Sequence, residues 1–103
     1  MVNVIIYLNK SLDAKELVDA LLRNQLIANA SIDLDNVSYQ LENDQIIESI
    51  NSVITAQTKA MLFSQIDNFL KEKYSDDVPI FSLPLTQVSH AFDSLIRSKT
   101  QKI

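Results

Sequence analysis

The sequence contains no glycine and no cysteine, and each absence excludes a class of function. A loop that cradles a phosphate brings its backbone close to the ligand and usually needs glycine to do so. Nucleotide sites of the Walker and Rossmann types are therefore excluded. Without cysteine the chain has no disulfide framework, no thiolate nucleophile and no cysteine-based zinc site.

Clustered basic residues and long apolar segments are also absent. The nine Lys and Arg are scattered among thirteen Asp and Glu, and the net charge is −4, whereas a nucleic-acid footprint needs clustered basic side chains. No apolar run reaches the roughly 18–20 residues of a membrane span, and the N-terminus lacks the layout of a signal peptide. We expect one soluble, cytoplasmic domain over residues 1–103, with neither nucleic acid nor membrane as a partner.

The chain is organised around a predicted hairpin of two long strands, residues 28–58. Asn43-Asp44 can form its two-residue loop, because Asn and Asp tolerate positive φ better than other non-glycine residues. Apolar side chains occupy even positions from Ala28 to Leu34 and odd positions from Val37 to Leu41. A strand cannot change faces in mid-run, so one extra residue must be absorbed near Asp35-Asn36, and a β-bulge or bend is predicted there.

The returning strand, residues 45–58, carries apolar side chains on both faces. One face holds Ile46, Ile50, Ile54 and Ala56, and the other holds Ile47 and Val53. A single covering layer buries only one face of a sheet. The second face therefore predicts another partner, and in so short a chain we expect a second copy of the same protein.

The remaining segments predict two more strands and three helices. Residues 2–8 form a central strand, and residues 78–85, which carry both prolines, form an edge strand. Ser11 is expected to cap a helix that ends near Asn24, and Thr58 to cap a second helix. A third helix spans about residues 89–98 and buries Phe92, Leu95 and Ile96, and residues 99–102 form a frayed tail.

The predicted order is β-α-β-β-α-β with an added C-terminal helix. This order is typical of the α+β ferredoxin-like sandwich, in which two helices cover one face of an antiparallel sheet. The opposite face of the sheet is left bare unless another element covers it.

Few side chains form a pattern with clear chemistry. Asp33 and Asp35 share a strand face and could hold a divalent ion, although solvated acids on a strand face are far commoner. The adjacent Asp76-Asp77 has the character of a polar loop. His90 is the single histidine, and a transition-metal site generally needs several N or S donors.

The sequence evidence for a group of catalytic residues is equally weak. Ser89, His90 and Asp93 could be drawn as a triad, but no nucleophile-elbow pattern surrounds them. Tyr7, Tyr39 and Tyr74 are too far apart in the sequence to predict convergence on one cleft. We expect no enzyme activity and no catalytic, cofactor-binding or metal-binding residues.

Several short motifs resemble those of the CutA family of divalent-cation tolerance proteins. The segments Asp77-Val78-Pro79-Ile80 and Leu83-Pro84-Leu85 resemble the family's Glu-Val-Pro-Glu-Ile and Leu-Pro-Ile. Gln25-Leu26-Ile27-Ala28-Asn29 is similar to Arg-Leu-Ala-Ala-Cys, and Tyr39-Gln40-Leu41-Glu42-Asn43 to Tyr-x-Trp-x-Gly. The resemblance spans nearly the whole chain. It implies a homotrimer, formed through the 28–58 hairpin, with a role in the response to divalent metal ions.

The chain departs from the family pattern at polar positions. The family's cysteine, a suspected metal ligand, matches Asn29, and its histidine and tyrosine match Tyr74 and Asp76. A glutamate and a lysine of the hairpin match Asn51 and Gln57. The oxygen donors that remain would favour hard cations, so we expect no bound cofactor and at most a hard divalent ion.

Four other families share this topology. A regulatory domain of the ACT or PII type, with a small molecule held between subunits, is the main alternative, although PII phosphate loops need glycine. An RNA-binding RRM sheet requires exposed aromatic residues and basic flanks, which are scarce here. Acylphosphatase chemistry needs an arginine-bearing phosphate loop where this chain has Asn9-Lys10-Ser11.

Overall fold

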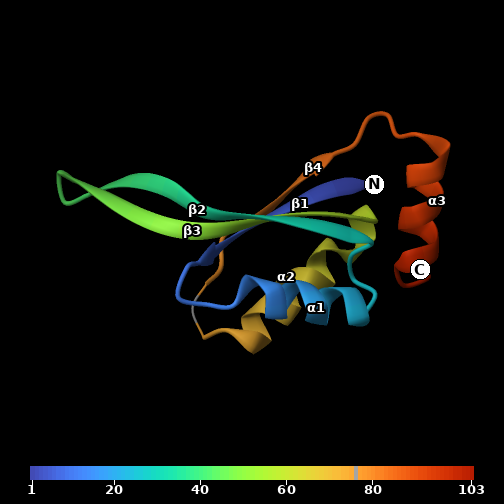
Figure 1. The fold of residues 1–103 in the computed structure, drawn as a ribbon, viewed down its shortest axis with the longest axis horizontal. Coiled ribbons are helices and arrows are strands. Elements are labelled where there is room, and N and C mark those ends of the chain that lie inside the picture. The colour runs from blue at the N-terminus through green and yellow to red at the C-terminus, as the bar shows by residue number, and fades with distance from the viewer. Residues whose placement is uncertain (76) are drawn as a thin grey trace.

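The computed structural model describes residues 1–75 and 77–103, and it shows a body from which a long hairpin projects (Figure 1). The molecule measures 47 × 28 × 21 Å along its principal axes. We call residues 34–50 the arm and the rest the body. The elements are β1 (Val2–Asn9), α1 (Ala14–Arg23), β2 (Asn29–Glu42), β3 (Gln45–Thr58), a 3-10 helix (Ala60–Leu62), α2 (Phe63–Lys73), β4 (Ile80–Pro84) and α3 (His90–Lys99).

The four strands form one antiparallel sheet in the order β2-β3-β1-β4, which confirms the ferredoxin-like α+β prediction. Strand β4 pairs only with β1 and is an edge, as its prolines predicted. The Leu85 amide donates to the Met1 carbonyl and the Tyr7 amide to the Pro79 carbonyl, both at 3.0 Å. Odd residues of β4 therefore face β1 with their backbone, and Pro84 faces outward, where its missing N–H removes no ladder bond.

Helices α1 and α2 cover one face of the sheet, and the core lies between the two layers (Figure 1). The core consists mainly of Val4, Ile6, Leu8, Leu17, Leu21, Ile54, Ala56, Ile66 and Leu70. Burial alternates along β1 and along the second half of β3, as a half-covered antiparallel sheet requires. None of the helices in residues 1–75 and 77–103 is long and apolar enough to cross a membrane.

Helix α1 begins two residues later than Ser11 would place it. Its N-cap is Asp13, whose Oδ1 accepts from the Glu16 amide at 3.0 Å. Ser11 instead donates its own amide to Asn9 Oδ1 at 2.9 Å, within the loop. The predicted serine cap was wrong because the aspartate two residues on supplies the acceptor in the right place for the first turn.

Thr58 is not a helix cap either. It is the last residue of β3, fully buried, and its hydroxyl donates to the Leu26 carbonyl at 2.6 Å. The 3-10 helix follows, and α2 begins at Phe63 without a side-chain cap. The prediction was wrong because a buried hydroxyl must be paired, and the loop before β2 offered a carbonyl across the sheet.

The hairpin matches its prediction in turn and bulge. Asn43 and Asp44 have φ values of 50° and 64°, as a type I′ turn requires, and Glu42 pairs with Gln45. The register shifts by one residue between Asp33 and Asn36, and Asp35 takes a positive φ of 62°. The bulge inferred from the change in apolar parity is confirmed.

The C-terminal residues are docked rather than frayed. Thr100 is only 4% exposed, and Gln101 donates its backbone and side-chain N–H groups to the carbonyls of Gln25 and Asn24, both at 2.9 Å. Helix α1 ends there with Gln25 at φ 57°, which leaves carbonyls that need donors. The predicted frayed tail was therefore wrong. In α3 only Ile96 is fully buried, whereas Phe92 and Leu95 are half-buried.

Candidate functional site

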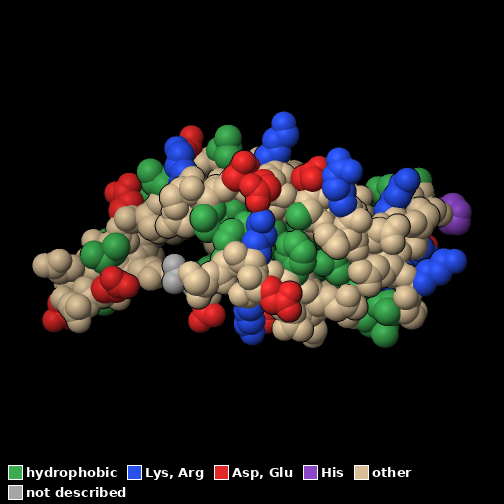
Figure 2. All heavy atoms as spheres, turned by 90° about the horizontal axis from the view of Figure 1, so that it is seen from below, with side chains coloured by type: hydrophobic (Ala, Val, Ile, Leu, Met, Phe, Trp, Pro, Cys, Tyr) green, Lys and Arg blue, Asp and Glu red, His purple; other side chains and the backbone are tan. Residues whose placement is uncertain are grey.

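A groove of about 410 Å³ lies where the arm leaves the body. In Figure 2 the molecule is visibly hollowed between arm and body. A second hollow of about 510 Å³ adjoins it and shares Tyr7, Asn51 and Pro79 with it. The groove is lined by Tyr7, Asn9, Leu12, Asn51, Lys73, Tyr74, Ser75, Asp77, Val78 and Pro79.

Two asparagines lie opposite each other on the sheet at the groove. Asn9 of β1 pairs with Asn51 of β3. The Lys10 amide donates to the Ile50 carbonyl at 3.2 Å, so the neighbouring Asn9–Asn51 pair is of the non-hydrogen-bonded kind. Side chains in such pairs approach closely, with about 4.5–5.5 Å between Cβ atoms. Asn9 Oδ1 accepts from the Ser11 amide, and Asn51 Nδ2 donates to Ser38 Oγ at 3.3 Å.

The opposite wall comes from the end of α2. Tyr74 is the C-cap residue, and its amide donates to the Leu70 carbonyl at 2.9 Å. Lys73 Nζ lies 2.6 Å from Glu16 Oε1 and 5.7 Å from the centre of the Tyr74 ring. The hydrogen bond to Glu16 raises the pKa of Lys73, and burial raises the pKa of Tyr74. At neutral pH this wall presents a neutral phenol beside a cation that already has a partner.

The groove brings together tyrosines that are far apart in the sequence, so the sequence analysis did not predict that they meet. Tyr7 and Tyr74 line the groove, while Tyr7 and Tyr39 line the adjoining hollow. The ring of Tyr7 also stacks on Phe81, with centroids 6.3 Å apart. The predicted topology could have indicated that Tyr7 and Tyr74 meet, because it brings the end of β1 and the segment after α2 to the same end of the sheet.

Asp33 and Asp35 of β2 do not lie on one regular strand face, as the sequence suggested. Asp33 and Asp35 would share a face only on an unbroken strand, and the bulge lies between Asp33 and Asn36. The Asp35 carboxylate instead forms an ion pair with Lys10. Within residues 1–75 and 77–103, no group of three or more His, Asp or Glu is placed to hold a metal ion. Asp77 is exposed at the groove, and Asp76 lies outside the described residues.

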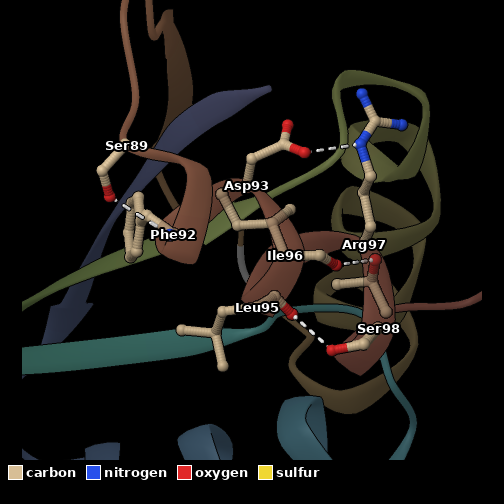
Figure 3. Close-up of polar contacts among 8 residues, drawn as sticks. Ser89, Phe92, Asp93, Leu95, Ile96, Arg97 and Ser98 are labelled. Atoms are coloured by element: carbon tan, nitrogen blue, oxygen red, sulfur yellow. Dashed lines mark hydrogen bonds and ion pairs between the residues drawn. The ribbon is translucent and has the colours of Figure 1, made fainter.

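The polar neighbours of His90 on α3 have structural roles (Figure 3). Ser89 is the N-cap, and its Oγ accepts from the Phe92 amide at 3.2 Å. Asp93 accepts from Arg97 Nε at 2.9 Å, one helical turn away. His90 is exposed at the first position of the helix. These contacts differ from those of a catalytic triad, in which histidine links the serine to the acid.

The family-matched positions fall at two separate places. Asn51 and Tyr74 both line the groove. Asn29 pairs with Gln57, and Gln57 Nε2 donates to Asn3 Oδ1 at 2.8 Å, at the start of β1. Since Asn3 and Asn9 are six strand residues apart, the two places are about 20 Å apart. Within one chain they cannot hold the same ion.

Comparison with known proteins decides the family. The protein-family model described as CutA1 divalent ion tolerance protein matches residues 2–99. The chain belongs to the CutA1 divalent ion tolerance family. No curated protein sequence matches the chain.

Solved CutA1 structures share its fold at low sequence identity. A variant of CutA1 from Pyrococcus horikoshii OT3 is 20% identical over 99% of this chain and 100% of its own, with a TM-score of 0.88. CutA1 from Oryza sativa is 15% identical over 99% and 94%, with a TM-score of 0.90. The periplasmic divalent cation tolerance protein CutA from Archaeoglobus fulgidus is 20% identical over 98% and 100%, with a TM-score of 0.84.

Membership of a divalent ion tolerance family suggests a metal site, but the residues at the matched positions of this chain do not suit a soft metal ion. The matched positions Asn29, Asn51 and Tyr74 offer amide and phenol groups in place of thiolate and imidazole. Copper and zinc prefer N and S donors, and hard cations prefer clustered carboxylates. Among residues 1–75 and 77–103, neither set converges at the groove, where Asp77 is the one described carboxylate that lines it.

Proposed function

We propose that this CutA1 protein acts without catalysis in the response to divalent cations, as a homotrimer joined through the 28–58 hairpin. The main observation that supports the homotrimer is the apolar surface of the arm. Leu34, Leu41 and Ile46 are 68%, 67% and 67% exposed, and Val37, Tyr39, Ile47 and Ile50 are exposed as well. Apolar patches of this kind on a projecting element are typical of protein interfaces.

The pairing of the arm supports the same proposal. Val37 lies opposite Ile50 and Leu41 opposite Ile46, so two apolar pairs flank the Tyr39–Glu48 pair on one face of the arm. Strand β1 ends at Asn9, opposite Asn51, and the ladder closes at the Lys10–Ile50 bond. Beyond that point no strand of residues 1–75 and 77–103 pairs with this edge of β3. A free edge with an apolar face is suited to extending the sheet of a neighbouring subunit.

We propose in addition that the protein is cytoplasmic, and this location and the non-enzymatic role have separate support. Ser89 and Asp93, the polar neighbours of the single histidine, are engaged in capping and in an ion pair within α3. A chain without cysteine suits a reducing compartment, where disulfides do not stabilise proteins. Fractionation of cells that produce the protein, with periplasmic and cytoplasmic markers, tests its location.

Sedimentation equilibrium tests the assembly. We expect a trimer at micromolar concentration and its dissociation by Ile47→Asp, because an interface would bury the new carboxylate without a partner. Met61→Asp is the matched control, since Met61 is an exposed apolar residue of the body, 70% exposed, outside the arm. A monomeric wild type, or equal dissociation by both variants, would contradict the proposal.

Calorimetric titration of chelator-treated protein tests the direct binding of metal. We expect Cu(II) and Zn(II) to bind only weakly and the folding to be independent of metal, because the matched positions lack soft donors. Submicromolar affinity that His90→Ala abolishes would show that the exposed histidine is a true ligand, supplied by several subunits together.

A further inference from the structure

We propose that the groove between arm and body binds a planar organic molecule whose edge carries a hydrogen-bond donor beside an acceptor, such as a carboxamide or the edge of a nucleobase. This ligand goes beyond the divalent-cation role proposed above. One chain supplies every residue named below.

The edge of the ligand is recognised by the asparagine pair. Among residues 1–75 and 77–103, Asn9 Nδ2 and Asn51 Oδ1 have no hydrogen-bond partner, while the other amide atom of each side chain is engaged. The pair therefore presents one donor and one acceptor from adjacent strands. The side chains of such a pair approach each other closely, so both groups can reach neighbouring atoms of one planar edge. An ion of either sign would use only one of the two groups.

The ring of the ligand is held by aromatic side chains. Tyr7 precedes Asn9 by two residues and lies on the same face of β1, about 6.5 Å away along the strand. Phe81 stacks against Tyr7 and fixes that ring as a platform. Tyr74 forms the opposite wall, where Lys73 lies against its ring. A flat ring can pack against these tyrosines while its edge reaches the asparagines.

The charge of the groove favours a neutral molecule. The lining cation, Lys73, is paired with Glu16 at 2.6 Å, so it is not available to neutralise a bound anion. Asp77 is exposed and adds negative charge at the rim. The volume of about 410 Å³ is within the range of about 300–1,000 Å³ that small-molecule sites occupy.

Two-dimensional NMR with benzamide as the probe tests the inference on the full-length protein. Benzamide joins a flat ring to an amide that both donates and accepts. N,N-dimethylbenzamide keeps the ring and the carbonyl but has no donor. We expect benzamide to shift the side-chain amide signals of Asn9 and Asn51 with a Kd of about 1 mM, which is typical of so small a ligand, and dimethylbenzamide to bind about tenfold more weakly.

Asn51→Ala is expected to weaken the binding of benzamide about tenfold, and Tyr74→Ala to weaken the binding of both probes. Asn68→Ala, at an exposed asparagine of α2 outside the groove, is the control and should leave binding unchanged. Equal binding of the two probes, shifts outside the groove, or equal effects of Asn51→Ala and Asn68→Ala would overturn the inference. Sedimentation of each variant reports the assembly separately, so failure of this ligand is distinguishable from failure of the trimer.

Discussion

The two halves of β3 follow one apolar pattern but lie in opposite environments. Ile54 and Ile50 are four residues apart and point to the same face of the strand. Ile54 is fully buried under α1 and α2, whereas Ile50 is 42% exposed on the arm. The pattern therefore specifies a face to be buried, and the length of the helical layer decides how much of it this chain can cover. The body completes its core alone, and the arm does not.

The largest expected effect separates these halves directly. Ile54→Ala should lower the free energy of unfolding by about 2–5 kcal/mol at every protein concentration, because it leaves a cavity in the core. Ile50→Ala should mainly change how unfolding depends on protein concentration, because its burial comes from another copy. Urea denaturation at several concentrations measures both. A concentration-independent loss of the same size in both variants would show that the halves do not differ.

Buried polar groups sharpen the comparison within the body. Thr58→Val should cost about 1–3 kcal/mol, because it leaves the Leu26 carbonyl without the donor now 2.6 Å away. Thr55→Val, on the half-exposed opposite face of the same strand, is the control and should change stability by about 0.5 kcal/mol or less. Thermal unfolding of the two variants compares them. Equal losses would mean that the Thr58 hydroxyl contributes nothing beyond its place in the strand.

Sequence patterns predicted the parts of the fold that depend on neighbouring residues. The change in apolar parity located the bulge at Asp35, and Asn43-Asp44 specified the turn. The order of elements then gave the sheet. Even the true cap of α1 had a local signal, because Asp13 and Glu16 have the spacing of a capping box.

What could not be predicted depends on contacts between distant segments. Gln101 docks on Asn24 and Gln25, and no local pattern marks a tail residue as the donor for those carbonyls. The groove likewise combines Tyr7 with Tyr74, from the first strand and the end of α2. Sequence distance hid this pair, although the predicted topology already placed both at one end of the sheet.

Positive φ angles give a smaller effect that again separates body from arm. Gln25 takes φ 57° at the end of α1, where glycine is the usual residue. Gln25→Gly should therefore stabilise the body by about 1 kcal/mol. Asp44→Gly at the arm tip should gain less, a few tenths of a kcal/mol, because aspartate already tolerates φ 64°. Chemical denaturation of both variants gives the order. A larger gain at the arm tip would contradict it.

The smallest expected effect concerns the junction between body and arm, at alkaline pH. In the folded protein burial raises the pKa of Tyr74, and the hydrogen bond to Glu16 raises the pKa of Lys73. Both groups hold their protons more tightly when folded. Their contribution to stability is therefore complete below the unfolded values, about 10 for Tyr and 10.4 for Lys, and is lost as the pH rises through the higher folded values.

Ultraviolet titration of the phenolate band checks this, since the chain has three tyrosines and no tryptophan to obscure them. Subtraction of the Tyr74→Phe curve from the wild-type curve should leave one transition above pH 10. Glu16→Gln should move the alkaline loss of stability to lower pH, because Lys73 loses the carboxylate charge of the hydrogen-bond partner that raises its pKa. A difference transition at or below the ordinary pKa of tyrosine would mean that Tyr74 is exposed to solvent. The boundary between the buried body and the exposed arm would then lie at the end of α2 rather than at the bulge.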